Sequence, residues 1–371
     1  MNRMGRAVVV AAIAVVAFFV VASPDARSQT AAVEAKYPPT TEGDFVVHNF
    51  KFESGETLAD LKLHYTTLGK PAKDAQGRTT NAVLILHGTG GSGHQFLAPY
   101  FANELFNPGQ ILDASRYYLI LVDGVGHGKS SKPSDGLHAH FPQYDYADMV
   151  ALHYKLLTEG LGVNHLRLIF GTSMGCMHSF VWGETYPDFM DALMPMACLP
   201  VQIAGRNRVW RKMLIDGIRT DPEWKNGDYT TEPPQGVRIA LDFLIIAGSA
   251  PIPMQKSMPT RDDADRFLEK YFHDRASGID ANDILYQVSA SRDYDPSANL
   301  EKIKAQVMWM NSADDFINPP DLGIAEREVK RLQHGKFILI PASEQTHGHG
   351  THTFAAIWKD HMAELLQQSA H

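Results

Sequence analysis

The chain has few cysteines and no excess of basic residues, which excludes several classes of protein. Its 371 residues include only two cysteines, so it is not a small secreted domain held together by a dense disulfide framework. Acidic residues outnumber basic ones, 42 to 34, and a net charge of −8 is typical of a poor nucleic-acid binder. No internal repeat, low-complexity tract or charged linker divides the sequence. It is therefore expected to form one large core with an insertion.

A long apolar run at the N-terminus carries the signals of export. Arg3 and Arg6 precede the uncharged residues 7–22, and small residues stand before a potential cut after Ser28. This pattern predicts a secretory signal peptide over residues 1–28 and a periplasmic or secreted mature protein, with no stable membrane insertion after cleavage. An uncleaved anchor and a buried helix are the alternatives, and the run is somewhat short for a membrane span.

The two cysteines, Cys176 and Cys198, are both expected near the upper end of a sheet. In an oxidising compartment they could form one disulfide. We expect two buried free thiols instead, because a large core does not need a covalent cross-link, although the pairing of cysteines cannot be read from sequence.

The segment Gly171-Thr172-Ser173-Met174-Gly175 has the pattern of a nucleophilic serine on a sharp turn. The apolar residues 166–170 before it predict a buried strand, and an apolar helical stretch follows over residues 174–186. A glycine two residues away on each side allows a turn too tight for side chains, which exposes the hydroxyl at the end of the sheet. A chance match in a loop would lack both flanking elements. Ser173 is the predicted nucleophile.

A glycine-rich turn earlier in the chain, His87-Gly88-Thr89-Gly90-Gly91, follows the apolar residues 82–86. Its backbone N–H groups are free to bind a developing oxyanion. We predict that the N–H groups of Thr89 and Met174 form an oxyanion hole. An ordinary strand-to-helix turn is the alternative.

Two adjacent aspartates follow the predicted strand 307–310, where a carboxylate is well placed to orient a histidine. Asp315 is the preferred acid because it stands four residues before Pro319, a spacing that hydrolases with a serine nucleophile often show. Asp314 is then expected to be a loop or cap carboxylate.

Three histidines lie between the last predicted strand, residues 337–340, and a terminal helix that starts near Thr353. His349 is the predicted base because it lies between two glycines, so its imidazole can turn toward the serine without a bulky neighbour. His347 and His352 are the alternatives. A metal site made by these histidines is disfavoured, because no carboxylate or cysteine cluster accompanies them.

Eight strand-like segments can be placed along the chain. The first two resemble an antiparallel hairpin. The others are short, continuous and apolar, and most alternate with helical stretches, as expected of a parallel sheet covered on both faces. The eight segments are residues 45–52, 61–66, 82–86, 117–122, 166–170, 192–197, 307–310 and 337–340.

The strand pattern stops between residues 201 and 300, where amphipathic helical patterns predict a lid. This insertion separates the two parts of the core, residues 29–200 and 301–371. Residues 206–211 either face the pocket, with Arg211 anchoring an anionic substrate, or form a solvated or salt-bridged helix face.

The segment Gly126-His127-Gly128-Lys129-Ser130 raises the alternative of nucleotide binding. A phosphate loop needs a glycine at the position that Asp123 occupies, so the register fails. A binding protein on an inactive scaffold of the same kind is disfavoured by the complete set of nucleophile, acid and base.

These residues resemble the α/β-hydrolase fold, and more closely its homoserine O-acetyltransferase-like branch. The resemblance implies a mostly parallel eight-stranded sheet with helices on both faces and a helical lid inserted after the sixth strand. The chain departs from the family at Cys176, where a second glycine is usual, and at Arg211, which lies about one helical turn further from the Asp-Pro pair. The motifs that carry the resemblance are Gly171 through Gly175, Phe141-Pro142, Asp148-Met149-Val150, Tyr186-Pro187-Asp188, Asp221-Pro222-Glu223-Trp224, Gly227-Asp228-Tyr229 and Asp315 through Pro320.

The predicted activity is cleavage of a small-molecule carboxylic ester through an acyl-serine intermediate, by an exported enzyme that needs no cofactor and binds no nucleic acid. Ser173 attacks, His349 takes and returns the proton, and Asp315 orients the imidazole. An acyl-CoA-dependent O-acyltransferase of the homoserine O-acetyltransferase type, which uses the same triad, is the alternative. Hydrolysis is preferred because acetyl-CoA is a cytoplasmic metabolite that an exported enzyme would not meet. A homodimer remains open.

Overall fold

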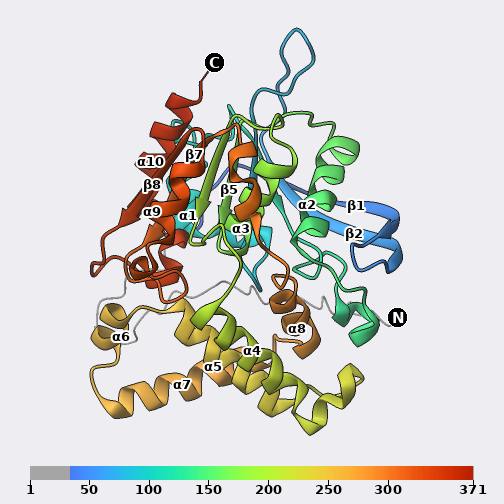
Figure 1. Ribbon diagram of the computed structural model, residues 1–371, viewed down its shortest axis with the longest axis vertical. Coiled ribbons are helices and arrows are strands. Elements are labelled where there is room, and N and C mark those ends of the chain that lie inside the picture. Colours follow the sequence, from blue (N-terminus) through green and yellow to red (C-terminus); the bar gives the residue numbers. More distant parts are fainter. Residues whose placement is uncertain (1–33, 371) are drawn as a thin grey trace, which may run out of the picture.

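A computed structural model describes residues 34–370, and the predicted signal peptide lies outside this range. Its centre is one eight-stranded sheet in the order β1-β2-β4-β3-β5-β6-β7-β8 (Figure 1). The pairs β1–β2 and β2–β4 are antiparallel and all others are parallel, which confirms the predicted sheet and its edge hairpin. The strands are β1 Thr40–Lys51, β2 Thr57–Leu68, β3 Ala82–Leu86, β4 Tyr118–Val122, β5 Leu168–Thr172, β6 Ala192–Met196, β7 Gln306–Ser312 and β8 Gly335–Ile340.

The central strands are buried on both faces, because successive side chains point to opposite sides of a sheet. In β3, Leu84 and Leu86 pack with α2 and α3, whereas Val83 and Ile85 pack with α1 and α10. The central strands can therefore be apolar at five successive positions, because a layer of helices covers each face of the sheet. The covering helices are α1 Pro99–Leu105, α2 Tyr146–Lys155, α3 Met174–Thr185, α9 Ile324–Glu328 and α10 Ala355–Gln368.

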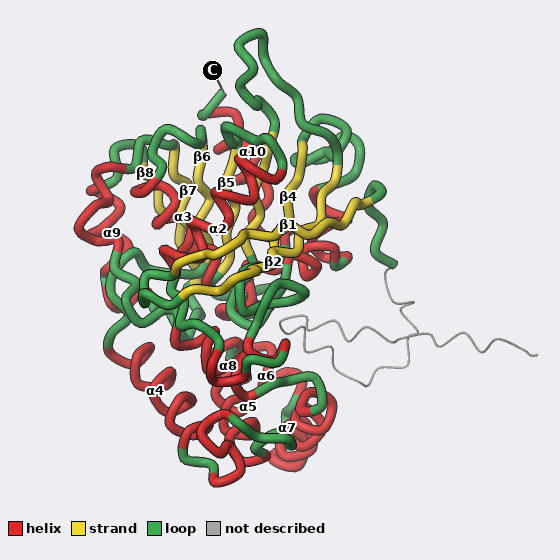
Figure 2. Tube along the Cα trace, turned by 90° about the vertical axis from the view of Figure 1, so that its right-hand side faces the viewer, coloured by secondary structure: helices red, strands yellow, loops and turns green. Residues whose placement is uncertain are grey.

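Five helices between β6 and β7 form a separate layer at one end of the sheet, at the bottom of Figure 2. All of them except α6 share an apolar cluster that includes Trp210, Leu214 and Leu241. The last of them is tied to the core by side chains: the Tyr286 hydroxyl donates to the Phe141 carbonyl at 2.6 Å. The lid helices are α4 Gly205–Arg219, α5 Pro234–Gly248, α6 Pro251–Ser257, α7 Arg261–Ala276 and α8 Ala281–Ser289.

Within residues 34–370, no single helix is long and apolar enough to cross a membrane. The helices α5 and α6 reach the required length and hydropathy only when they are counted together, and they meet at 109°.

Candidate active site

Ser173 lies on the tight turn between β5 and α3. Its φ of 55° and ψ of −109° are unusual for a residue with a side chain, and such strain is concentrated at functional sites. A Cβ atom on Gly175 would lie 2.2 Å from the Leu86 carbonyl oxygen, and one on Gly171 would lie 2.0 Å from the carbonyl oxygen of Gly175. Backbone packing therefore requires glycine at both positions, which presents the serine at the end of the sheet.

Three side chains from separate loops meet in a hydrogen-bonded line. The Ser173 hydroxyl and His349 Nε2 are 2.7 Å apart, and His349 Nδ1 is 2.9 Å from Asp315 Oδ2. His349 comes from a short 3₁₀ helix, Gly348–Thr353, between β8 and α10. Asp315 follows the end of β7. In the neutral tautomer with Nδ1 protonated, the imidazole donates to the carboxylate and accepts from the hydroxyl, as a general base must.

Asp315 is held as a carboxylate although it is fully buried. Burial would raise its pKa, but the His349 imidazole, the Asn318 side chain and the Ile317 N–H group outweigh burial and hold the pKa below its ordinary value. The Asn318 amide group donates to Asp315 Oδ2 at 2.9 Å, and the Ile317 N–H donates to Oδ1 at 2.7 Å. These donors fix the carboxylate opposite the imidazole.

The alternative acid and bases occupy other positions. Asp314 accepts hydrogen bonds from the Thr346 hydroxyl and the Gly348 N–H, so it holds the loop that carries His349. The His347 ring stacks on the Phe354 ring at 4.0 Å between centroids. His352 is buried beside His349, and burial lowers its pKa to about 3.

Both predicted oxyanion donors belong to segments that adjoin Ser173. Met174 is the first residue of α3, and the N–H groups of a helix's first turn have no partner inside the helix. The next N–H group, that of Gly175, donates to the His87 carbonyl. Thr89 follows Gly88, whose Cβ position is 3.2 Å from the Ser173 Cβ atom. The glycine-rich turn thus lies directly against the serine.

A pocket of about 480 Å³ opens between the glycine-rich turn, the predicted oxyanion site, and the lid. Thr89 and Ser92 line it on the core side, while Leu241, Leu244 and Val288 form an apolar wall from α5 and α8. Ser173 is next to this pocket rather than in its wall. The space suits a substrate with both an apolar part and a polar part.

Arg211, on α4, is a buried cation with 3 % exposure. Its guanidinium donates to the Asn207 side chain at 2.9 Å and to the Ser291 hydroxyl at 3.0 Å, and none of its partners within residues 34–370 is a carboxylate. Burial lowers the pKa of Arg211 and raises that of Tyr146, and Tyr146 in turn interacts with both Arg211 and Thr89. The cation therefore lies on the side of the predicted oxyanion turn.

The prediction of free thiols was wrong, because Cys176 and Cys198 form a disulfide. Cys176 lies in the first turn of α3, and Cys198 lies just beyond the end of β6, which neighbours β5 in the sheet. Parallel pairing brings these two positions within a Cα–Cα distance of 5.8 Å. Whether the disulfide forms is decided by the proximity of the two chain segments, and not by whether the core needs a cross-link.

Sequence reasoning also missed Asn318 and a set of buried histidines. Asn318 stands inside the Asp315 to Pro320 stretch, but nothing in its pattern signals contact with the acid. His153 is fully buried, and both of its ring nitrogens lack a hydrogen-bond partner in the described structure. In residues 34–370, no group of three or more histidine, cysteine, aspartate or glutamate side chains is arranged to hold a metal ion.

Comparisons with known proteins agree with this architecture. A family model described as the alpha/beta hydrolase fold matches residues 81–343. A probable acyltransferase of Methanothermobacter thermautotrophicus is 29% identical over 284 residues, which cover 75% of this chain and 84% of that protein. The homoserine O-acetyltransferase of Pelobacter propionicus is 27% identical over 338 residues, with 81% and 88% covered.

Two solved structures share the fold. Homoserine O-acetyltransferase from Bacillus anthracis has a TM-score of 0.77 at 19% identity, covering 88% of this chain and 97% of that one. An acetylester hydrolase from Corynebacterium glutamicum has a TM-score of 0.74 at 20% identity, covering 88% and 96%. The chain therefore belongs to the α/β-hydrolase fold family, and within it is similar to homoserine O-acetyltransferases.

Proposed function

We propose that the protein is an O-acyltransferase that works through an acyl-Ser173 intermediate. The observation that carries the acyl-Ser173 intermediate is the hydrogen-bonded line from Ser173 through His349 to Asp315, with distances of 2.7 and 2.9 Å. Transfer to an acceptor other than water is favoured by the relatives named as acyltransferases. Ser173 attacks the acyl donor while His349 takes its proton. The N–H groups of Met174 and Thr89 stabilise the tetrahedral oxyanion, and His349 returns the proton to the leaving group.

In the second half of the reaction, His349 deprotonates the acceptor hydroxyl, which then attacks the acyl-serine. The environment of Arg211 favours an acceptor that carries a carboxylate. A buried guanidinium with no carboxylate partner is costly, and a bidentate anionic group is its natural complement. The relatives named as acyltransferase and homoserine O-acetyltransferase favour the same class of reaction.

Hydrolysis of a carboxylic ester is the second candidate, with water in place of the acceptor hydroxyl. One structural observation favours it. A disulfide between Cys176 and Cys198 persists in oxidising compartments, which agrees with the predicted export and removes the enzyme from cytoplasmic acetyl-CoA. Both candidates share the nucleophile and the acyl-enzyme, so only the acceptor distinguishes them.

A thiol-release assay with acetyl-CoA, run with and without L-homoserine, separates the two activities. The proposal predicts saturable CoA release that requires homoserine and disappears in Ser173→Ala. Hydrolysis of p-nitrophenyl acetate without any homoserine-dependent CoA release would overturn the transferase in favour of the hydrolase.

A matched pair of variants on α4 tests the acceptor site. Arg211→Lys keeps the charge but loses the planar fork of donors, so the KM for homoserine should rise about tenfold or more, while p-nitrophenyl acetate hydrolysis changes little. Arg208→Lys, on the same helix, is the control and should leave both values close to wild type. Equal effects of the two variants would contradict the assigned role of Arg211.

A further inference from the structure

A three-residue segment, Met196 to Cys198, contacts Ser173 and Cys176 directly and Asp315 through Asn318. Its first residue accepts a hydrogen bond from the Ser173 N–H at 2.8 Å. Its last residue is covalently joined to Cys176, three positions after the nucleophile. Met196 is the last residue of β6, and the Ala197 N–H still donates to the Met310 carbonyl of β7, whereas Cys198 lies beyond the paired strand and needs other contacts to hold it.

The middle of the segment reaches the acid. The Ala197 carbonyl accepts a hydrogen bond from the Asn318 side chain at 3.0 Å, and the same amide group donates to Asp315 Oδ2 at 2.9 Å. Ala197 has a φ of 67°, a conformation that costs energy for a residue with a side chain and persists only where neighbours impose it.

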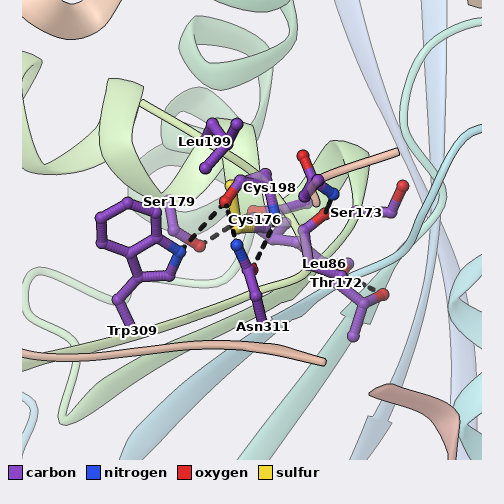
Figure 3. The surroundings of a disulfide bond; sticks show 12 residues. Leu86, Thr172, Ser173, Cys176, Ser179, Cys198, Leu199, Trp309 and Asn311 are labelled. Carbon is purple, nitrogen blue, oxygen red and sulfur yellow. Dashed lines mark hydrogen bonds between the residues drawn. A yellow bond between two sulfur atoms is a disulfide. The ribbon is translucent and has the colours of Figure 1, made fainter. Parts of the chain in front are cut away.

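The end of the segment is clamped from two sides (Figure 3). The Cys198 carbonyl accepts from Trp309 Nε1 at 3.0 Å and from the Asn311 side chain at 3.1 Å, and the Cys198 N–H donates to Asn311. On the opposite side, the disulfide joins Cys198 to α3. Trp309 and Asn311 come from β7, the strand that leads to Asp315, so the clamp joins the nucleophile's helix to the acid's strand.

We propose that the Cys176–Cys198 disulfide is a positioning element of the active site. It holds the Met196 to Cys198 segment against α3, and through Asn318 it fixes Asp315 in register with His349 and Ser173. This inference rests on the proposed acyl-Ser173 chemistry. Cys176 is fully buried and Cys198 is 2 % exposed, so the bond is shielded from dissolved reductants in the folded protein. The disulfide is therefore a constant part of the site rather than a surface switch.

The test uses the rate at which a fluorophosphonate probe labels Ser173, because this readout needs no knowledge of the natural substrate. In Cys176→Ala/Cys198→Ala, the second-order labelling rate should fall about tenfold or more. With p-nitrophenyl acetate, kcat should fall by a similar factor while KM changes little, because the defect is in alignment rather than in the pocket. Leu61→Ala, in the core of β2 away from the site, is the control for reduced stability and should label at the wild-type rate.

A double-mutant cycle shows whether the disulfide acts through the acid. Asn318→Ala breaks the link between the segment and Asp315 while the disulfide stays intact, and it should slow labelling on its own. When it is combined with the double cysteine variant, the loss should be clearly smaller than the product of the two separate losses, since both act through one segment.

Wild-type labelling in the double cysteine variant, or independent effects that multiply with Asn318→Ala, would overturn the positioning role while leaving Ser173 as the nucleophile. If Leu61→Ala slows labelling as much as the double cysteine variant does, the loss reflects reduced stability, and the positioning role is overturned as well. If the wild-type protein is not labelled at all, the assignment of Ser173 as nucleophile is contradicted, and this inference fails with it.

Discussion

Asp314 and Asp315 are adjacent in the chain, yet their carboxylates bind different parts of the same loop. Asp315 meets the His349 imidazole at 2.9 Å, whereas Asp314 binds the Thr346 hydroxyl at 2.8 Å and the Gly348 N–H at 3.2 Å. One aspartate therefore orients the imidazole of His349, the predicted base, and the other holds the loop that carries it.

This division predicts unequal effects of two isosteric changes. Asp315→Asn should lower kcat roughly 10⁴-fold. The amide stabilises the wrong imidazole tautomer and, being neutral, does not stabilise the imidazolium that forms during the reaction. Asp314→Asn keeps one acceptor oxygen and should cost only about tenfold, the equivalent of one weakened hydrogen bond. Steady-state kinetics on p-nitrophenyl acetate measure both. A larger loss in Asp314→Asn would reverse the assignment of the acid.

The three histidines of the same loop should also differ. His349→Ala is expected to lower kcat roughly 10⁴-fold or more, because nucleophile and base act as one unit. His347→Ala loses only a stacking contact with Phe354, and its effect should stay within about tenfold. His352→Ala removes an imidazole whose pKa burial lowers to about 3, so no charge at neutral pH is lost. Comparable losses in all three variants would contradict the choice of His349.

The buried histidines predict a loss of stability in acid. Burial lowers the pKa of His153 to about 3 and the pKa values of His127 and His178 well below their ordinary range. In the unfolded chain an imidazole takes up a proton below about pH 6.5. These groups therefore contribute stability that is complete above pH 6.5 and is lost as the pH falls toward 3.

Urea unfolding of His153→Leu measures this effect. The slope of unfolding free energy against pH, between about pH 6 and 4, should decrease by up to about 1.4 kcal/mol per pH unit, because one fewer proton is taken up on unfolding. At pH 7.5 the variant should be at least as stable as wild type, since a buried polar ring without partners is replaced by an apolar side chain. An unchanged slope would show that His153 does not titrate between the two states.

The disulfide should also contribute to global stability. It joins residues 22 positions apart, and closing a loop of that length is worth about 3 kcal/mol in the chain-entropy model. Urea unfolding of Cys176→Ala/Cys198→Ala should therefore give an unfolding free energy lower by about this amount. Cys198→Ala alone, which leaves one thiol, should cost nearly as much. A single variant that retained wild-type stability would argue against a formed disulfide in the native protein.

The local pattern of residues was sufficient to predict most of the fold. The turn around Ser173 is specified within five residues, because glycines at 171 and 175 are the only residues that fit against Leu86 and each other. The buried strands follow from continuous apolar runs such as β3 and β4, and the predicted helix over residues 174–186 is α3 in the structure. The catalytic roles of Ser173, His349 and Asp315 remain predictions, although the structure brings the three side chains into one line.

Apart from the Ser173, His349 and Asp315 set, contacts between residues distant in the chain were not predicted from sequence patterns. The order of the strands brings Cys176 beside Cys198, and the end of β7 places Asn318 between Ala197 and Asp315. Only the packed core leaves His153 without partners. Glycine spacing and apolar periodicity are local properties that a few neighbouring residues express. A disulfide, a buried amide bridge or a desolvated imidazole exists only where separate segments meet, so the tertiary structure alone decides it.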